Sequence, residues 1–407
     1  MKFTRRRLLA SAAGLCLVPG CLGSSGDSDR SLPTTPTGVW NQSGNDARNT
    51  SNPDVTVPDR GTPAWSSGSG LITPLVVDET VYTVDDVLTA LDTQTGDTRW
   101  QAELDIAESP NSATQPAVVG GHVLLASDDR LASFDTTDGT LRWDRSITGS
   151  PGGPITVDTD RQMGFAFFRR PERSESASEL VAFDAESGDT TWTAQLSGIS
   201  SAPAVFRDHV YVTGWAGLDT RVLRCFDVDS GGLVWEREPE DPKTRPVCTE
   251  TGVLVGEGAA VTVYNHSNGM RLASVEVSQE DIRAIAIDDG TVFVLAGSGL
   301  SAVSVPDGDE QWSREENQAR GDGLAVGDNS IVAPVSPESL GSGPSVAAFD
   351  KTDGTLRWQY VVDGTFSPKI VSPPVIADGA VFVISNTETG VAALGDLPPQ
   401  EEATNSP

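Results

Sequence analysis

Reactive side chains are scarce in this chain of 407 residues, which contains four cysteines and three histidines. No two cysteines are adjacent, and His122, His209 and His266 are too far apart to form a metal-binding motif. The sequence also lacks a Gly-x-Ser-x-Gly elbow and a phosphate-binding loop. It therefore predicts no catalytic residues, no metal site and no cofactor site, and the histidines are interpreted as solvated turn residues.

Positive charge is scarce as well, because 28 basic residues face 58 acidic ones and the net charge is −30. Only four of the basic residues are lysines. Such an excess of carboxylates repels itself, and molar salt shortens the Debye length to about 3 Å and relieves that repulsion. The composition predicts a protein adapted to concentrated salt, of the type found in halophilic archaea. It excludes nucleic acid as a partner.

Long hydrophobic runs are missing, and the apolar stretch Leu8–Val18 is shorter than the roughly 20 residues that span a bilayer. The preceding Thr4-Arg-Arg-Arg-Leu-Leu resembles a twin-arginine export motif, and Leu17-Val-Pro-Gly before Cys21 resembles a lipobox. We therefore predict a signal peptide over residues 1–20, lipidation of Cys21, and a flexible tether over residues 21–38. The predicted location is the outer face of the cytoplasmic membrane, with the lipid as the only membrane attachment. Simple secretion without Cys21 is the alternative.

The chain does contain an internal repeat. The segment Leu88–Trp100 recurs six more times at a period of roughly 38 to 49 residues, which is typical of propeller blades. All seven copies contain a glycine at the same point, namely Gly96, Gly139, Gly188, Gly231, Gly269, Gly308 and Gly354. Six copies end on a tryptophan, namely Trp100, Trp143, Trp192, Trp235, Trp312 and Trp358, whereas the fifth ends on Ala273.

Each copy is interpreted as a strand, a tight turn and a second strand. The glycine supplies a positive φ in the turn, and an aspartate such as Asp92 or Asp135 caps the turn amides. The tryptophan packs between neighbouring sheets.

A further pair of short strands precedes each copy, and an eighth such pair follows the last copy. Only one more strand follows this eighth pair, so the last sheet lacks its fourth strand. A spare strand that contains Trp65 precedes the first pair. Adding this strand to the last sheet closes a ring and removes an exposed edge. The predicted fold is therefore all-β: an eight-bladed β-propeller of four-stranded antiparallel blades over residues 39–397, followed by a disordered tail over residues 398–407.

This glycine–tryptophan repeat resembles the pyrroloquinoline quinone (PQQ) repeat family over about residues 39–397. Its members include quinoprotein dehydrogenases and the lipoprotein subunit of the bacterial outer-membrane assembly machinery. The segment that begins Trp40-Asn-Gln-Ser-Gly-Asn also resembles the opening segment of such proteins. For a dehydrogenase the resemblance would imply PQQ with calcium, an adjacent cysteine pair and an aspartate base. The missing cysteine pair favours a non-enzymatic protein without a cofactor, and a PQQ-dependent oxidoreductase acting on alcohols or sugars is the alternative.

Connection lengths indicate which face carries the function. If the strands of a blade are labelled A to D from the centre outward, the A–B and C–D turns lie on one face and the B–C and D–A connections on the other. The variable connections are all of the second kind: residues 169–178, 214–221 and 335–345 for B–C, and 105–115, 236–245 and 363–373 for D–A. We therefore expect this face to act as a scaffold that binds other surface or membrane proteins, or another ligand.

Within these connections, Trp215 is a candidate aromatic anchor and Arg169, Arg170 and Arg173 are candidate polar contacts. Each assignment has an alternative without a binding role. The arginines would then lie in a solvated loop in which neighbouring glutamates balance their charge, and Trp215 would pack on an adjacent loop. Cys225 and Cys248 are interpreted as core residues, with a disulfide between them as the alternative.

Overall fold

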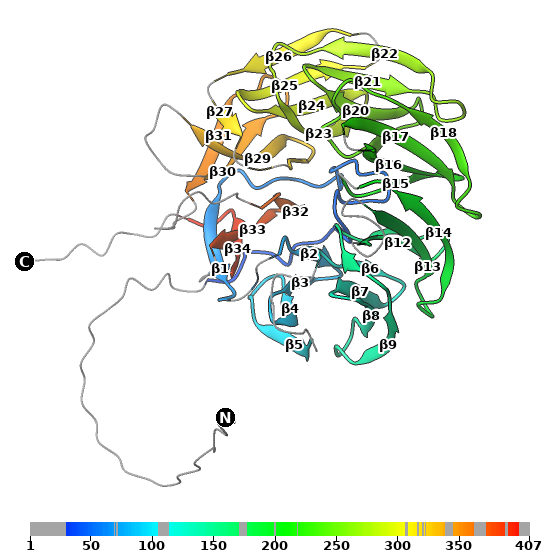
Figure 1. Cartoon of the computed structure of the whole chain (residues 1–407). Coiled ribbons are helices and arrows are strands. Elements are labelled where there is room, and N and C mark those ends of the chain that lie inside the picture. Colours follow the sequence, from blue (N-terminus) through cyan, green and yellow to red (C-terminus); the bar gives the residue numbers. More distant parts are fainter. Residues whose placement is uncertain are drawn as a thin grey trace, which may run out of the picture.

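The chain forms a ring of eight antiparallel sheets, as the repeat predicts (Figure 1). The computed structural model describes residues 30–398, apart from residues 69, 71, 105–113, 171–176, 199–200, 218, 306–307, 316, 320, 322, 338–344, 362–371 and 387–389. Within the described ranges there is no helix, and hence none that is long and apolar enough to cross a membrane. The predicted all-β, eight-bladed propeller is confirmed.

The first four blades follow the chain order, each from the innermost strand outward. Blade 1 contains β2 (Leu75–Val77), β3 (Thr80–Val84), β4 (Val87–Asp92) and β5 (Thr98–Glu103), and blade 2 contains β6 (Ala117–Val119), β7 (His122–Ser127), β8 (Arg130–Asp135) and β9 (Leu141–Ser146). In blade 3 the innermost position is shared by β10 (Ser150–Pro151) and β11 (Thr156–Asp158), followed by β12 (Met163–Arg169), β13 (Ser178–Asp184) and β14 (Thr190–Leu196). Blade 4 contains β15 (Ala204–Phe206), β16 (His209–Ala216), β17 (Thr220–Asp227) and β18 (Leu233–Arg237).

The next three blades repeat this order. Blade 5 contains β19 (Val247–Cys248), β20 (Val253–Glu257), β21 (Ala260–Tyr264) and β22 (Arg271–Glu276), and blade 6 contains β23 (Ile282–Asp288), β24 (Thr291–Ala296), β25 (Gly299–Ser304) and β26 (Glu310–Arg314). In blade 7 the innermost position is shared by β27 (Asn317–Ala319) and β28 (Ala325–Val326), followed by β29 (Ser330–Pro337), β30 (Ser345–Asp350) and β31 (Leu356–Val361).

Blade 8 joins the two ends of the chain. It contains β32 (Val375–Ala377), β33 (Ala380–Asn386) and β34 (Gly390–Gly395), and its outermost strand is β1 (Thr62–Ser66). Trp65 of β1 lies opposite Ala393 of β34, and the Trp65 ring lies 5.9 Å from the ring of Phe382. The spare N-terminal strand therefore completes the last blade, as predicted from the strand count.

Repeat tryptophans pack against repeat glycines of the following blade. A Cβ atom added to Gly139 would lie 2.4 Å from the ring of Trp100, and the same relation joins Trp65 to Gly96. Each indole also donates a hydrogen bond across the same boundary; that of Trp100 reaches the carbonyl of Thr136 at 3.0 Å. The boundary after blade 5 differs, because Ala273 replaces the tryptophan and Gly308 has no atom within 4 Å of the corresponding position. These pairs confirm that the tryptophan packs between sheets.

The repeat turns have the predicted geometry. All seven repeat glycines have a positive φ, including 74° at Gly139 and 86° at Gly308. The carboxylate of Asp135 accepts a hydrogen bond from the amide of Thr137 at 2.7 Å, and this bond holds the pKa of Asp135 below its usual range. The turn aspartates therefore cap the turns, as predicted.

The segment of residues 37–57, here called the belt, makes a complete circuit of the ring against the inner strands. It is the blue trace that runs around the centre in Figure 1. Its carbonyls accept hydrogen bonds from amides in, or directly after, the inner strands of seven blades: Thr37 from Asp378, Trp40 from Val76, Asn41 from Val118, Ala47 from Val205, Arg48 from Cys248, Thr50 from Ile287, Ser51 from Val326 and Thr56 from Gly379. At blade 3 the side chain of Gln42 replaces the backbone, because its amide pairs with both the N–H and the carbonyl of Val157.

The last residues of the predicted flexible tether contact the ring. Residues 30–38 lie against the ring, where Leu32 is 2% exposed and its amide donates to the carbonyl of Gln94 at 2.9 Å. The sequence shows no hydrophobic periodicity here, so nothing local predicts the contact. Residues 1–29 of the predicted signal peptide and tether, together with the tail from residue 399, lie outside the described residues.

Two smaller interpretations also have an outcome. Cys225 and Cys248 are both buried and free within one core cluster, so they are core residues and not a disulfide. The histidines are not solvated as a group. His122 is 5% exposed and lies 2.8 Å from the hydroxyl of Ser133. His266 bonds to the hydroxyl of Tyr211 and the carbonyl of Thr249.

Candidate binding face

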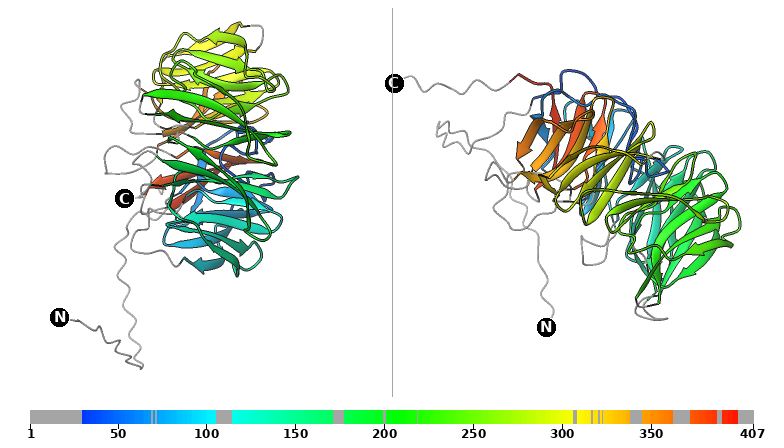
Figure 2. Two further views of the ribbon diagram at one scale, coloured as in Figure 1. Left: turned by 45° about the vertical axis from the view of Figure 1, so that its right-hand side comes forward. Right: turned by 90° about the horizontal axis from the view of Figure 1, so that it is seen from above.

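The two faces of the ring differ in the regularity of their connections. On one face the C–D turns are alike, and each repeat glycine donates to a carbonyl four residues earlier at 2.8–3.0 Å. On the other face, here called the loop face, the connections vary from the short β3–β4 turn to the long segments between β5 and β6, β18 and β19, and β31 and β32. Figure 2 shows the ring from two further sides.

Blade 4 extends toward the loop face as a long hairpin. Its strands β16 and β17 continue to Ala216 and Thr220, so the connection expected over residues 214–221 is mostly strand. Trp215 lies directly opposite Arg221, whose guanidinium lies 4.6 Å from the centre of the Trp215 ring. The half-buried Trp215 also lies close to Gly198. Trp215 is thus held in place by a cation–π contact while part of its surface stays exposed.

Of the three candidate arginines of blade 3, the two that the structure describes differ in exposure. Arg169 ends β12 and is exposed. Arg170 is 7% exposed and forms a buried ion pair with Glu179 of β13, so its charge is used inside the blade. This corrects its expected role as a surface contact, because a buried cation keeps its partner to avoid the cost of an unpaired charge. Arg173 lies outside the described residues.

A row of ion pairs crosses the loop face from blade 4 to blade 6. Arg221 lies 3.3 Å from Asp241, which lies 3.6 Å from Lys243. Lys243 lies 3.0 Å from Asp281, and Arg283 of β23 lies 3.2 Å from the same carboxylate. The ion pair with Lys243 lowers the pKa of Asp281 and raises that of Lys243. The row therefore connects the Trp215 hairpin to the centre of the ring.

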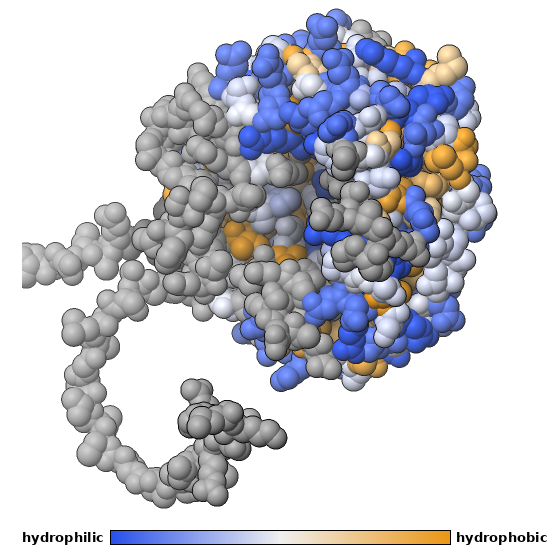
Figure 3. All heavy atoms as spheres, viewed as in Figure 1, coloured by the Kyte–Doolittle hydropathy of each residue, from blue (hydrophilic) through white to orange (hydrophobic). Residues whose placement is uncertain are grey.

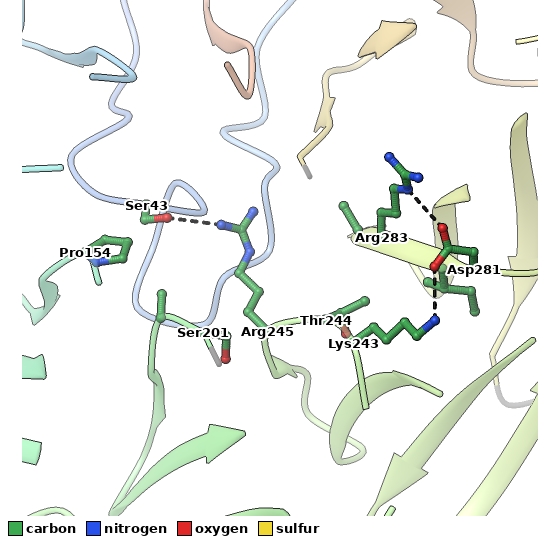
Figure 4. Close-up of a pocket in the computed structure, with 11 residues that line it drawn as sticks. Ser43, Pro154, Ser201, Lys243, Thr244, Arg245, Asp281 and Arg283 are labelled. Carbon is green, nitrogen blue, oxygen red and sulfur yellow. Dashed lines mark hydrogen bonds and ion pairs between the residues drawn. The ribbon is translucent and has the colours of Figure 1, made fainter. Parts of the chain in front are cut away.

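At the end of this row lies a cavity of about 430 Å³ at the inner ends of blades 3 to 6. It is lined by Ser43, Pro154, Ser201, Ala202, Lys243, Thr244, Arg245, Asp281, Ile282, Arg283 and Ala284. Figure 4 shows Lys243 and Arg283 meeting at Asp281, while Arg245 extends away from them toward Ser43 of the belt. The cavity thus has an edge formed by the belt and walls formed by residues that lie just before, or at the start of, four inner strands.

Sequence reasoning missed this cavity, although one signal was available. Lys243 and Arg245 lie in the long connection of residues 236–245, where two of the few basic residues are two positions apart. Asp281 and Arg283 lie before and at the start of a strand without any motif. Only the ring brings these residues together.

The cavity does not match the PQQ site that the resemblance implies for a dehydrogenase. Its lining contains no aromatic side chain and a single carboxylate, Asp281, which is already shared by two cations. Among the described residues, no group of three or more histidine, cysteine, aspartate or glutamate side chains could hold a metal ion. The residues that line this cavity do not fit a quinone with its calcium.

Comparison with known sequences agrees with the repeat. The chain matches the family described as outer membrane protein assembly factor BamB over residues 50–213, 173–249 and 218–405. The chain belongs to this family. A curated relative, the serine/threonine-protein kinase AfsK of Streptomyces griseus, is 28% identical over 144 residues. That match covers 33% of this chain and 17% of the kinase, so the chain spans less than a fifth of its length.

Solved structures share the fold of the BamB-family chain. BamB from Moraxella catarrhalis is 13% identical with a TM-score of 0.59, and the match covers 81% of this chain and 95% of that one. The quinohemoprotein alcohol dehydrogenase of Comamonas testosteroni is 14% identical with a TM-score of 0.66, covering 89% and 82%. The computationally designed protein Ika8 is 14% identical with a TM-score of 0.64, covering 84% and 99%. At these identities the likeness concerns the fold alone.

Proposed function

We propose that this BamB-family chain is a non-enzymatic binding protein of the cell surface that holds other surface or membrane proteins on its loop face. The observation that carries the proposal is the position of Trp215. It stands at the end of the blade 4 hairpin, partly exposed and stacked on Arg221. Tryptophan and arginine side chains supply a disproportionate share of the energy in protein interfaces.

The contrast between the two faces supports this assignment. The opposite face repeats one turn, whose residues are engaged by capping bonds and by the packing of tryptophan on glycine. The loop face instead has connections of different length on a rigid ring, which is the usual arrangement of a recognition surface. BamB is described as an assembly factor, and this description is compatible with a scaffold for other proteins.

Export and anchoring complete the proposal. The twin-arginine segment and Cys21 support a lipoprotein that the lipid holds on the outer face of the cytoplasmic membrane. Replacement of Arg5 and Arg6 by lysine should retain the precursor in the cytoplasm. Cys21→Ser should move the protein from the membrane fraction to the medium, and unchanged fractionation would remove the anchor from the proposal.

The binding role is tested by comparing Trp215→Ala with Arg169→Ala in capture of partners from detergent-solubilised native membranes. We expect Trp215→Ala to reduce capture at least tenfold, because a buried aromatic anchor contributes about 2 kcal/mol or more. Arg169→Ala should have a smaller effect, because concentrated salt screens exposed charges. Arg170 is left unchanged, because its removal would leave Glu179 buried without a partner. Equal capture by Trp215→Ala and the unmodified chain, or an unfolded Trp215→Ala, would reject the assignment.

A further inference from the structure

The central cavity gathers positive charge in a strongly acidic protein. Three cations line it, Lys243, Arg245 and Arg283, against the single anion Asp281. The chain as a whole carries 58 acidic and 28 basic residues. The charge of the cavity is therefore opposite to that of the molecule, whose surface seen from the side of Figure 1 is mostly hydrophilic in Figure 3.

Arg245 is the cation with the weakest compensation. Its guanidinium donates to the hydroxyls of Ser43 and Ser51 of the belt at 3.1 and 2.8 Å, and both acceptors are neutral. None of the ion pairs within the described residues includes Arg245, and the nearest acidic influence is Asp46, which itself bonds to Arg48 and Thr50. Burial lowers the pKa of Arg245 to about 10, so the group stays charged at neutral pH.

A guanidinium in this situation favours an anionic occupant. A cation removed from water is costly unless it is paired, and arginine presents a planar pair of N–H groups that fits the two oxygens of a carboxylate or phosphate. Arg283 provides a second guanidinium in the lining of the cavity, and it bonds to Asp281 through its Nε. The hydroxyls of Ser201 and Thr244 and the apolar side chains of Pro154 and Ile282 complete a lining typical of small-molecule sites.

We propose that this cavity binds a small organic anion, with its carboxylate or phosphate group against Arg245 and within reach of Arg283. The volume of about 430 Å³ lies within the range of small-molecule sites and does not suit an extended polymer. This site is separate from the Trp215 contact and does not depend on it. Asp281 lowers the affinity for the anion, because its carboxylate neutralises part of the positive charge of Lys243 and Arg283.

The proposal is tested by calorimetric titration of the full chain with succinate, with glycerol phosphate and with uncharged glycerol. The titrations use the lowest potassium chloride concentration at which the melting temperature of the protein no longer rises with added salt. We expect at least one of the two anions to bind with one site per chain and glycerol not to bind. Succinate alone would assign a carboxylate ligand, and glycerol phosphate alone a phosphate ligand.

Variants locate the binding. Arg245→Gln and Arg283→Gln should each weaken it about tenfold, because each removes a charge-assisted hydrogen bond. Asp281→Asn should strengthen it several-fold. Arg271→Gln, a control on the exposed outer strand β22, should leave it unchanged. Arg283→Gln and Asp281→Asn do not touch the belt, so they remain informative if Arg245→Gln fails to fold. Binding of neither anion, or wild-type affinity in Arg245→Gln and Arg283→Gln, would overturn the proposal.

Discussion

At the scale of single residues, each repeat glycine has two separable roles. It takes a positive φ, and at six of the seven repeat positions it leaves room for a tryptophan of the preceding blade. Gly308 has the first role without the second, because the preceding blade ends on Ala273. The natural exception in the repeat thus offers an internal control.

Gly139→Ala should therefore destabilise the ring more than Gly308→Ala. Both variants place a side chain at positive φ, which costs about 1–2 kcal/mol. Gly139→Ala also forces its Cβ to 2.4 Å from the Trp100 ring, so displacement of the indole should add about 1–3 kcal/mol. Denaturant unfolding measures the difference. Equal free energies of unfolding for the two variants would show that the tryptophan contact is not tight.

His266 should make stability depend on pH above the range in which carboxylates titrate. Its Nε2 donates to the carbonyl of Thr249 at 2.8 Å, which leaves Nδ1 to accept from the hydroxyl of Tyr211 at 2.7 Å. Burial lowers the pKa of His266, so the folded state favours the neutral ring. The stability from this preference is present above the unfolded pKa of about 6.5 and is lost as the pH falls through the lowered folded value.

His266→Asn should therefore lose less stability than the unmodified chain on acidification from about pH 7.5 to about pH 5.5. Melting curves at several pH values measure both slopes. Parallel slopes for the two proteins would contradict the neutral, buried state of His266.

At the scale of elements, β1 and the belt tie the N-terminal region to every blade. β1 completes blade 8, and the belt bonds to the inner strand of each blade in turn. This arrangement leaves no open sheet edge at the closure and fills the centre with backbone. Ring closure and the belt are therefore expected to contribute together to one cooperative unit.

A chain that begins at residue 70 should be less stable than one that begins at residue 30. The loss should exceed the roughly 3–5 kcal/mol for removal of one buried tryptophan, because Trp40 and Trp65 are lost together with the belt bonds. Both chains lack residues 1–29, so the comparison isolates the belt and β1. Equal melting temperatures in high salt would show that the ring closes without them.

The elements also show how far sequence reasoning reaches. The blades were predictable because each one repeats the same glycine turn and tryptophan at a fixed spacing. The belt was not, since its polar side chains and carbonyls bond to residues far away in the chain, as Gln42 does to Val157. Burial of Arg170 was missed for the same reason, because its partner Glu179 becomes a neighbour only through the pairing of β12 with β13. The cavity likewise exists only once the ring brings its lining together.

At the scale of the whole molecule, we infer different roles for the two faces of the ring. The regular face carries the turns that hold the blades together, and the loop face carries Trp215, the row of ion pairs and the central cavity. Six of the large exposed apolar side chains of the described residues lie on outer strands, namely Leu141, Leu233, Val234, Leu272, Leu356 and Val361. Met270 lies just before β22, and Val39 lies in the belt. Recognition of a protein partner should then engage one face and leave the other free.

The most direct measurement places a photo-crosslinking amino acid at one of two exposed aspartates of blade 4 in living cells. Asp219 lies in the turn between β16 and β17 on the loop face, and Asp229 lies in the turn between β17 and β18 on the opposite face. We expect crosslinks to surface or membrane proteins from position 219 and none from position 229. Crosslinks from position 229 alone would contradict the assignment of the binding face.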